Sequence, residues 1–162
     1  MKILTKDNMK DINEGDIEFF SFCDSGGMGD PGNLEIVTKD KQAFEFNCID
    51  DELDLDMFFS HFKQLEKVLN GDVLWEEDIE KTSYKWINLG MGNSLFVKVS
   101  IYDKFVQALI KEIIDFCSKT NDSFCPNISV LKNIKSIDEL DPILLYKNWF
   151  KVANEILEVE NN

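Results

Sequence analysis

The stretch YKWINLGMGNSLFVKVSIYDKFVQALIKEIIDFCSK, residues 84–119, decides the expected fold. Its first part holds two short runs rich in β-forming residues, Tyr84–Leu89 and Leu95–Val99. They flank the turn sequence Gly90-Met91-Gly92-Asn93, a pattern typical of a β-hairpin. From Ser100 an S-x-x-D sequence resembles a helix capping box, and the apolar residues after it recur at helical spacing. We therefore expect an antiparallel hairpin that leads directly into a helix filling the rest of the stretch.

Upstream of this stretch the sequence predicts three further strands and one helix. The strands are expected at Ile17–Cys23, Leu34–Thr38 and Ala43–Cys48. The polar tripeptide Lys39-Asp40-Lys41 predicts a hairpin turn between the second and third of them. An apolar period of 3.6 residues begins after Asp54 or Asp56, either of which suits an N-cap, and ends at Asn70-Gly71. This pattern predicts the helix.

Downstream, the break at Cys125-Pro126 separates the helix of residues 100–119 from a final helical region. That region begins with an S-x-x-E capping box at Ser136 and restarts at Pro142, where proline suits the first turn of a helix. The order of elements predicts an α+β fold, an antiparallel sheet of about five strands with three or four helices packed on one face. At 162 residues we expect a single domain over residues 1–162.

The acidic residues are concentrated in the first half of the chain. Residues 1–80 hold 21 Asp and Glu against 7 Lys, whereas residues 81–162 hold 10 of each, so the first half carries the whole net charge of −14. The candidate binding residues are two acidic clusters and one tryptophan beside them: Asp50, Asp51, Glu52, Asp54, Asp56, Asp72, Trp75, Glu76, Glu77, Asp78 and Glu80. A field of this sign repels nucleic acid and anionic membranes and attracts a basic protein or a cation. We therefore expect an acidic face that binds a partner protein.

Two motifs that resemble ligand sites lack residues that those sites need. The glycines of Gly27–Gly32 match the dinucleotide pattern G-x-G-x-x-G, but the apolar run Leu34–Val37 predicts a strand where a helix N-terminus must hold the pyrophosphate. The alternating acids of Asp50–Asp56 resemble a calcium loop, yet Leu55 and His61 occupy the positions of the required glycine and glutamate. A weak calcium site of another kind stays open as an alternative.

The sequence favours a protein without enzymatic activity or cofactor. It contains no nucleophile elbow, P-loop or H-E-x-x-H motif, and the single histidine, His61, lies among phenylalanines. The four cysteines form no C-x-x-C pair, so we expect buried free thiols in a reducing cytoplasm, with a zinc site that includes His61 as the alternative. The charged N-terminus predicts no signal peptide and no apolar run is long enough to span a membrane, which favours a cytoplasmic location.

Two glycine-rich segments, Ser25–Gly32 and Trp86–Asn93, together with the small size and acidity, resemble the immunity proteins of bacterial polymorphic-toxin and contact-dependent growth-inhibition systems. The resemblance covers less than a fifth of the chain and carries no site residues with it. It implies a cytoplasmic inhibitor of one cognate toxin domain. An acidic face suits a toxin of the nuclease type, whose groove must be basic to hold phosphates.

Two alternatives from other classes remain. One is a small hydrolase or transferase that uses carboxylates in a pocket beside the two glycine-rich loops, which we expect at one end of the sheet. The other is a regulatory adaptor whose acidity serves only solubility.

Overall fold

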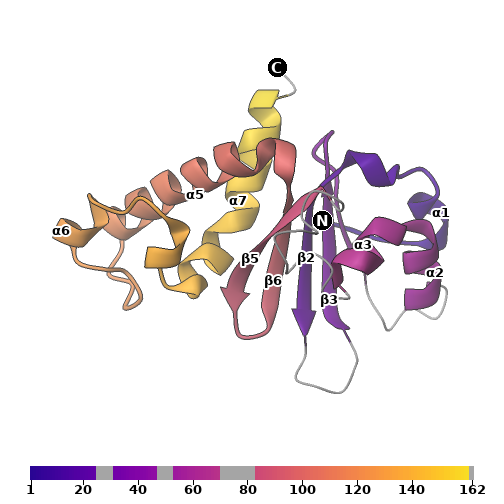
Figure 1. The fold of residues 1–162 in the computed structure, drawn as a ribbon, viewed down its shortest axis with the longest axis horizontal. Coiled ribbons are helices and arrows are strands. Elements are labelled where there is room, and N and C mark those ends of the chain that lie inside the picture. The colour runs from indigo at the N-terminus through magenta and orange to yellow at the C-terminus, as the bar shows by residue number, and fades with distance from the viewer. Residues whose placement is uncertain (25–30, 47–52, 70–82, 161–162) are drawn as a thin grey trace.

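The computed structural model describes residues 1–24, 31–46, 53–69 and 83–160. A six-stranded sheet with the order β1-β4-β3-β2-β6-β5 lies between two layers of helices (Figure 1). The strands are β1 (Lys2–Ile3), β2 (Ile17–Asp24), β3 (Pro31–Thr38), β4 (Ala43–Phe46), β5 (Tyr84–Gly90) and β6 (Asn93–Lys98). β1 and β4 are parallel, and all the other neighbouring pairs are antiparallel.

Short helices cover one face of the sheet, and two long helices, joined by the short α6, cover the other. The first layer holds α1 (Lys6–Met9), α2 (Leu55–His61) and α3 (Lys63–Lys67), and the second holds α5 (Val99–Lys119), α6 (Ile128–Leu131) and α7 (Pro142–Glu160) (Figure 1). Two 3₁₀ turns, η1 (Glu14–Asp16) and η3 (Ile137–Glu139), precede β2 and α7. The first half of the chain therefore builds the short-helix layer, and the second half builds the long-helix layer.

The predicted α+β class is confirmed, but the predicted antiparallel sheet of about five strands with three or four helices on one face is wrong. The described residues form six strands, one pair of them parallel, and six α-helices on two faces. β1 and α1 were missed because residues 1–16 are mostly polar, although Thr5 and Asn8 form a capping box. The helix predicted before Asn70 is divided into α2 and α3 at Phe62, whose φ of −110° and ψ of 71° are not helical.

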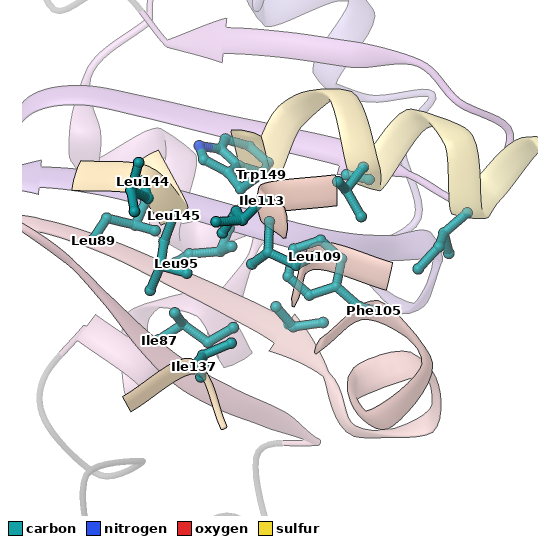
Figure 2. Close-up of a cluster of buried hydrophobic side chains, with 14 of the residues drawn as sticks. Ile87, Leu89, Leu95, Phe105, Leu109, Ile113, Ile137, Leu144, Leu145 and Trp149 are labelled. Atoms are coloured by element: carbon teal, nitrogen blue, oxygen red, sulfur yellow. The ribbon is translucent and has the colours of Figure 1, made fainter. Parts of the chain in front are cut away.

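The long-helix face has a core built from two amphipathic helices (Figure 2). The predicted stripe of α5 is buried at Ile101, Phe105, Leu109 and Ile113, and at its end Cys117 is buried while the predicted Phe116 is only half-buried. The predicted stripe of α7 is buried throughout: Leu144, Leu145, Trp149, Val152, Ile156 and Leu157. Phe19 of β2 joins the sheet to both helices, because its ring lies 4.9 Å from that of Phe105 and 6.4 Å from that of Trp149.

The short-helix face has a second core made largely of aromatic rings. Phe58 of α2 lies at its centre, with ring centroids 5.0 Å from Phe62, 5.7 Å from Phe46 and 6.5 Å from Phe20. Phe20 and Phe19 are adjacent in β2 and both fully buried, because successive strand residues point to opposite faces. A strand that is apolar on both sides needs cover on both sides, which explains the second layer.

Candidate functional site

Most of the predicted acidic site lies outside the described residues. Asp50, Asp51, Glu52, Asp72, Trp75, Glu76, Glu77, Asp78 and Glu80 belong to residues 47–52 and 70–82. Of the predicted set, the structure describes Asp54 and Asp56, which lie at the start of α2.

Asp54 is the N-cap of α2. Its Oδ1 accepts a hydrogen bond of 2.8 Å from the backbone N–H of Met57, which satisfies one of the free donors at the helix start. Asp56 is exposed in the first turn, where a negative charge is favourable. Asp54 therefore has a structural role, while the Asp56 carboxylate faces solvent.

A hollow of about 480 Å³ beside these two acids carries both signs of charge. Lys6 and Lys10 line it together with Asp54 and Asp56. His61, which also lines it, has its Nε2 2.9 Å from the backbone carbonyl of Ile12, so the ring ties α2 to the segment after α1. The imidazole here makes a structural contact.

A larger hollow of about 700 Å³ lies between α1 and the β3–β4 turn, and its lining is also mixed. It contains Asp11, Asp16 and Asp40 together with Lys2 and Lys39. Thr38 and Gln42 hold the carboxylate of Asp40 in the turn. These hydrogen bonds lower the pKa of Asp40, the bond from Thr38 contributing most. The turn predicted at residues 39–41 is confirmed, and this carboxylate shapes it.

The residues that flank the two acidic stretches belong to one hydrophobic cluster. Phe46 and Leu53, on either side of residues 47–52, are 3% and 1% exposed in the aromatic core of the short-helix face. Leu69 packs against the same core before residues 70–82, and Tyr84 after them is 2% exposed in it. The described residues that flank the two acidic stretches therefore share one core, that of the short-helix face.

A third hollow, of about 490 Å³, lies at the opposite face of the sheet, between the ends of the strands and the first half of α7. Its floor is polar. Ser21 and Cys23 of β2 are in register with Glu35 and Asn33 of β3, and Cys23 is also paired with Asn93 of β6. Because side chains alternate along a strand, these residues share one face of three adjacent strands.

The two glycine-rich loops leave the sheet at this same end. The pairs Cys23–Asn33 and Cys23–Asn93 lie where β2, β3 and β6 meet their loops. The β5–β6 turn is a tight one, with Gly90 at φ 79°, Met91 at 52° and Gly92 at 79°. The expectation that both loops lie at one end is thus confirmed for the described residues that flank them.

Glu35 is the most unusual group in the floor of this hollow. Its Oε2 accepts a hydrogen bond of 3.2 Å from the Ser21 hydroxyl, and Glu45 is its cross-strand neighbour on β4. Burial raises the pKa of Glu35 above its ordinary value, the hydrogen bond from Ser21 opposes this rise, and the like charge of Glu45 adds to it. Glu35 is absent from the predicted site, because charge density in the sequence marks only the acidic clusters. The sequence feature that could have identified Glu35 is its position between the apolar residues Leu34 and Ile36 of a strand.

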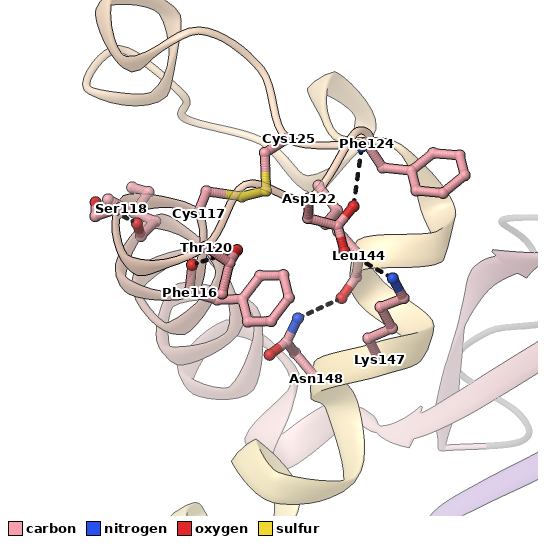
Figure 3. The surroundings of a disulfide bond; sticks show 11 residues. Phe116, Cys117, Ser118, Thr120, Asp122, Phe124, Cys125, Leu144, Lys147 and Asn148 are labelled. Carbon is pink, nitrogen blue, oxygen red and sulfur yellow. Dashed lines mark hydrogen bonds and ion pairs between the residues drawn. A yellow bond between two sulfur atoms is a disulfide. The ribbon is translucent and has the colours of Figure 1, made fainter.

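The other wall of the hollow is aromatic and comes from α7. Trp149 and Phe150 pack edge to face with ring centroids 5.5 Å apart, and Tyr146 is 51% exposed. Lys147 lines the hollow too, but its Nζ lies 2.7 Å from the Asp122 carboxylate (Figure 3). This hydrogen bond lowers the pKa of Asp122, so the lysine charge is already paired.

A disulfide bond corrects the expectation of free thiols. Cys117 at the end of α5 is bonded to Cys125 in the following loop, with their Cα atoms 5.6 Å apart (Figure 3). Cys23 is free, and Cys48 lies outside the described residues. The bond removes two thiolates from the alternative zinc site. Within the described parts of the chain, no group of three or more His, Cys, Asp or Glu side chains is arranged to hold a metal ion.

None of the helices in the described segments combines the length and the apolar character needed to cross a bilayer. No protein-family model, curated protein or solved structure matches this chain.

Proposed function

We propose that this protein is a non-enzymatic immunity protein. It binds a basic toxin domain of the nuclease type through an acidic face on the short-helix side of the sheet. The acids concerned are those of Asp50–Asp56 and Asp72–Glu80, with Trp75 as an apolar anchor among them. Aromatic residues surrounded by polar groups are common at the centres of protein interfaces.

The observation that supports this proposal best is the common attachment of the two acidic stretches. Phe46, Leu53, Leu69 and Tyr84 join both stretches to one hydrophobic cluster. In this proposal, charges that are separated in the sequence act together from one side of the molecule. The other side is built by residues 81–162, whose acids and lysines balance.

Such an arrangement accelerates association with a basic partner. Long-range attraction orients the two proteins before contact and raises the association rate, an effect that salt screens. A nuclease groove must be basic to hold phosphates, so it provides a complementary surface.

The proposal includes a cytoplasmic location, where a disulfide is unusual because thiols are kept reduced. It therefore requires that Cys117 and Cys125 are reduced in the cell or that their bond resists reduction. Alkylation of free thiols in intact cells, followed by mass spectrometry of the peptide that contains Cys125, measures which state occurs. A protein found only on the outer side of the cell membrane would contradict the proposed location.

The binding proposal is tested by matched charge reversals. The tagged chain is used to capture its partner from the native host at low salt, and the purified partner is used for stopped-flow kinetics. We expect one basic protein bound at about 1:1. Reversing Glu76, Glu77, Asp78 and Glu80 to Lys slows its association by about tenfold or more and weakens the salt dependence.

The control reverses four exposed acids of the long-helix face: Asp103, Asp115, Glu155 and Glu158. It changes the net charge by the same amount, so it should slow association much less. Equal slowing in the two variants would show that only net charge matters and would overturn the acidic face. The absence of any protein partner at any salt concentration would overturn the inhibitor function itself.

A further inference from the structure

We propose that the hollow between the sheet and the first half of α7 binds a small organic cation, an ammonium or guanidinium group on an apolar body. The site is independent of the proposed inhibitor function, because none of the described residues that line it belongs to the acids of Asp50–Asp56 and Asp72–Glu80. It is built from Ser21 and Cys23 of β2, Asn33 and Glu35 of β3, and the aromatic wall of α7.

The dimensions and lining of this hollow fit a small molecule. Its volume of about 490 Å³ lies within the range of roughly 300–1,000 Å³ typical of ligand sites. One wall is apolar and aromatic, and the polar groups converge on the floor from three adjacent strands. Ligand sites usually combine an apolar enclosure with a few placed polar groups in this way.

Two carboxylates at the floor favour a cation. The groups that face Glu35 are the hydroxyl of Ser21 and the carboxylate of Glu45, so two neighbouring carboxylates share this part of the sheet. Two described residues with a cationic group also line the hollow: Lys147, whose charge is paired with Asp122, and Met1, which carries the α-amino group. A bound cation relieves the repulsion between the two carboxylates and replaces the water that Glu35 loses through burial.

The aromatic wall favours the same class of ligand. Tyr146 and Phe150 line the same hollow as Glu35, and the faces of aromatic rings attract ammonium and guanidinium groups. They also provide apolar surface for the body of the ligand. The net charge of −14 raises the local concentration of cations around the molecule and lowers that of anions.

The test uses a panel of defined probes and the full chain. We would titrate ¹⁵N-labelled protein with three cations, 2-phenylethylamine, agmatine and benzyltrimethylammonium, and follow the NMR chemical shifts. The control is 2-phenylethanol, the neutral analogue of 2-phenylethylamine. We expect saturable shifts at Ser21, Glu35 and Tyr146 for at least one cation, and at least about tenfold weaker binding of the alcohol. No saturable binding of any cation would overturn the proposal, as would equal affinity for 2-phenylethylamine and 2-phenylethanol.

Two matched variants locate the site. Glu35→Gln keeps the size of the side chain and should weaken cation binding by about tenfold or more, whereas Glu155→Gln removes one exposed carboxylate elsewhere and should not. Equal weakening in both variants would assign the effect to net charge and overturn the site. Tyr146→Ala provides a second variant in which Glu35 is intact, and it should also weaken binding because the wall is lost. Thermal unfolding of each variant confirms that it is folded.

The pH dependence gives a further check with benzyltrimethylammonium, whose charge does not change with pH. Its binding should decrease as the pH falls through the raised pKa of Glu35. The other titratable groups near this site are Glu45, Cys23, Tyr146, Lys147 and the α-amino group of Met1. The same titration on Glu35→Gln gives their contribution. An identical pH profile in the two proteins would remove Glu35 from the site.

Discussion

The two faces of the sheet are stabilised in different ways. On the long-helix face, α5 of 21 residues and α7 of 19 residues each bury a continuous apolar stripe. On the short-helix face, α1, α2 and α3 have only 4, 7 and 5 residues, and a cluster of phenylalanines fills the space beneath them. The neutral half of the chain therefore has the regular architecture, and the acidic half has the irregular one.

The comparison shows that long helices and short helices are stabilised in different ways. A helix of five or six turns gains enough buried area from its own periodic stripe. A helix of one or two turns is marginal alone and depends on a few large side chains and on caps. Phe58 and Asp54 provide these two contributions in α2.

The largest expected effects come from one phenylalanine in each core. Phe105→Ala and Phe58→Ala each remove a fully buried ring, so each should lower the free energy of unfolding by about 3–5 kcal/mol. Urea unfolding followed by circular dichroism measures both losses. The control is Gln107→Ala at an exposed site of α5, which should lower the free energy of unfolding by about 0.5 kcal/mol or less. A loss below about 1 kcal/mol for Phe58→Ala would mean that the short-helix face lacks a tightly packed core.

A smaller effect on stability is expected from removal of the disulfide. Among the described residues, this bond occurs on the long-helix face only. The bonded cysteines are 8 residues apart, so the loop-entropy relation gives about 2.5 kcal/mol of stability. Replacing Cys117 and Cys125 together by Ser should lower the unfolding free energy of the oxidised protein by about this amount. Cys23→Ser, which removes a free thiol, is the control. If reduction of the native protein leaves its melting temperature unchanged, the bond does not contribute to stability.

The helix cap of α2 has an expected effect of about 1 kcal/mol. Asp54→Ala removes the hydrogen bond to the N–H of Met57 and should lower the unfolding free energy by this amount. Asp56 lies two residues away and makes no cap, so Asp56→Ala should change the free energy of unfolding by less than about 0.5 kcal/mol. The pair separates structural from binding roles, because only Asp56→Ala can weaken a partner without an effect on the fold. Equal destabilisation by both would contradict the capping role of Asp54.

The smallest expected effect is a pH-dependent one at Glu35. Its pKa in the folded state is raised above the unfolded value, so the folded state binds the proton more tightly. This tighter binding stabilises the folded state. The stabilisation is fully present at pH values below the pKa of Glu35 in the unfolded state, and it is lost as the pH rises through the pKa in the folded state. Relative to the native chain, Glu35→Gln should therefore become more stable as the pH rises from the ordinary pKa of a glutamate through the raised pKa of Glu35. Chemical unfolding across this range measures the difference, with Glu155→Gln as the reference for the loss of one charge. A difference that falls as the pH rises would contradict the raised pKa.

The regular half of the fold was the more predictable half. The hairpin, the stripes of α5 and α7, and the start of α7 at Pro142 follow from periodicity and capping signals that act within a few residues. The pairing of β1 with β4 and the division of α2 from α3 depend on contacts between distant parts of the chain. The adjacent apolar residues Phe19 and Phe20 are typical of a strand that is buried on both faces, whereas the predicted fold has helices on one face of the sheet only.

The site was harder to predict than the fold. Charge density marks Asp50–Glu80 in the sequence, but the same count cannot distinguish a cap such as Asp54 from an exposed acid such as Asp56. Glu35 has no acidic neighbours in sequence, and its neighbour Glu45 becomes one only through the register of β3 and β4. Half-buried groups of this kind are revealed by strand pairing, which one sequence alone does not specify.

The strand order has a consequence for synthesis on the ribosome. β2 is made early, but β6, which covers one of its edges, is completed only at Lys98. Until then the backbone of β2 presents an unpaired edge between apolar side chains on both faces, and such an edge attracts strands of neighbouring nascent chains. The residues translated during this interval include both acidic clusters. Their mutual repulsion keeps nascent copies apart, so the same charges act as gatekeepers against aggregation before the sheet is complete.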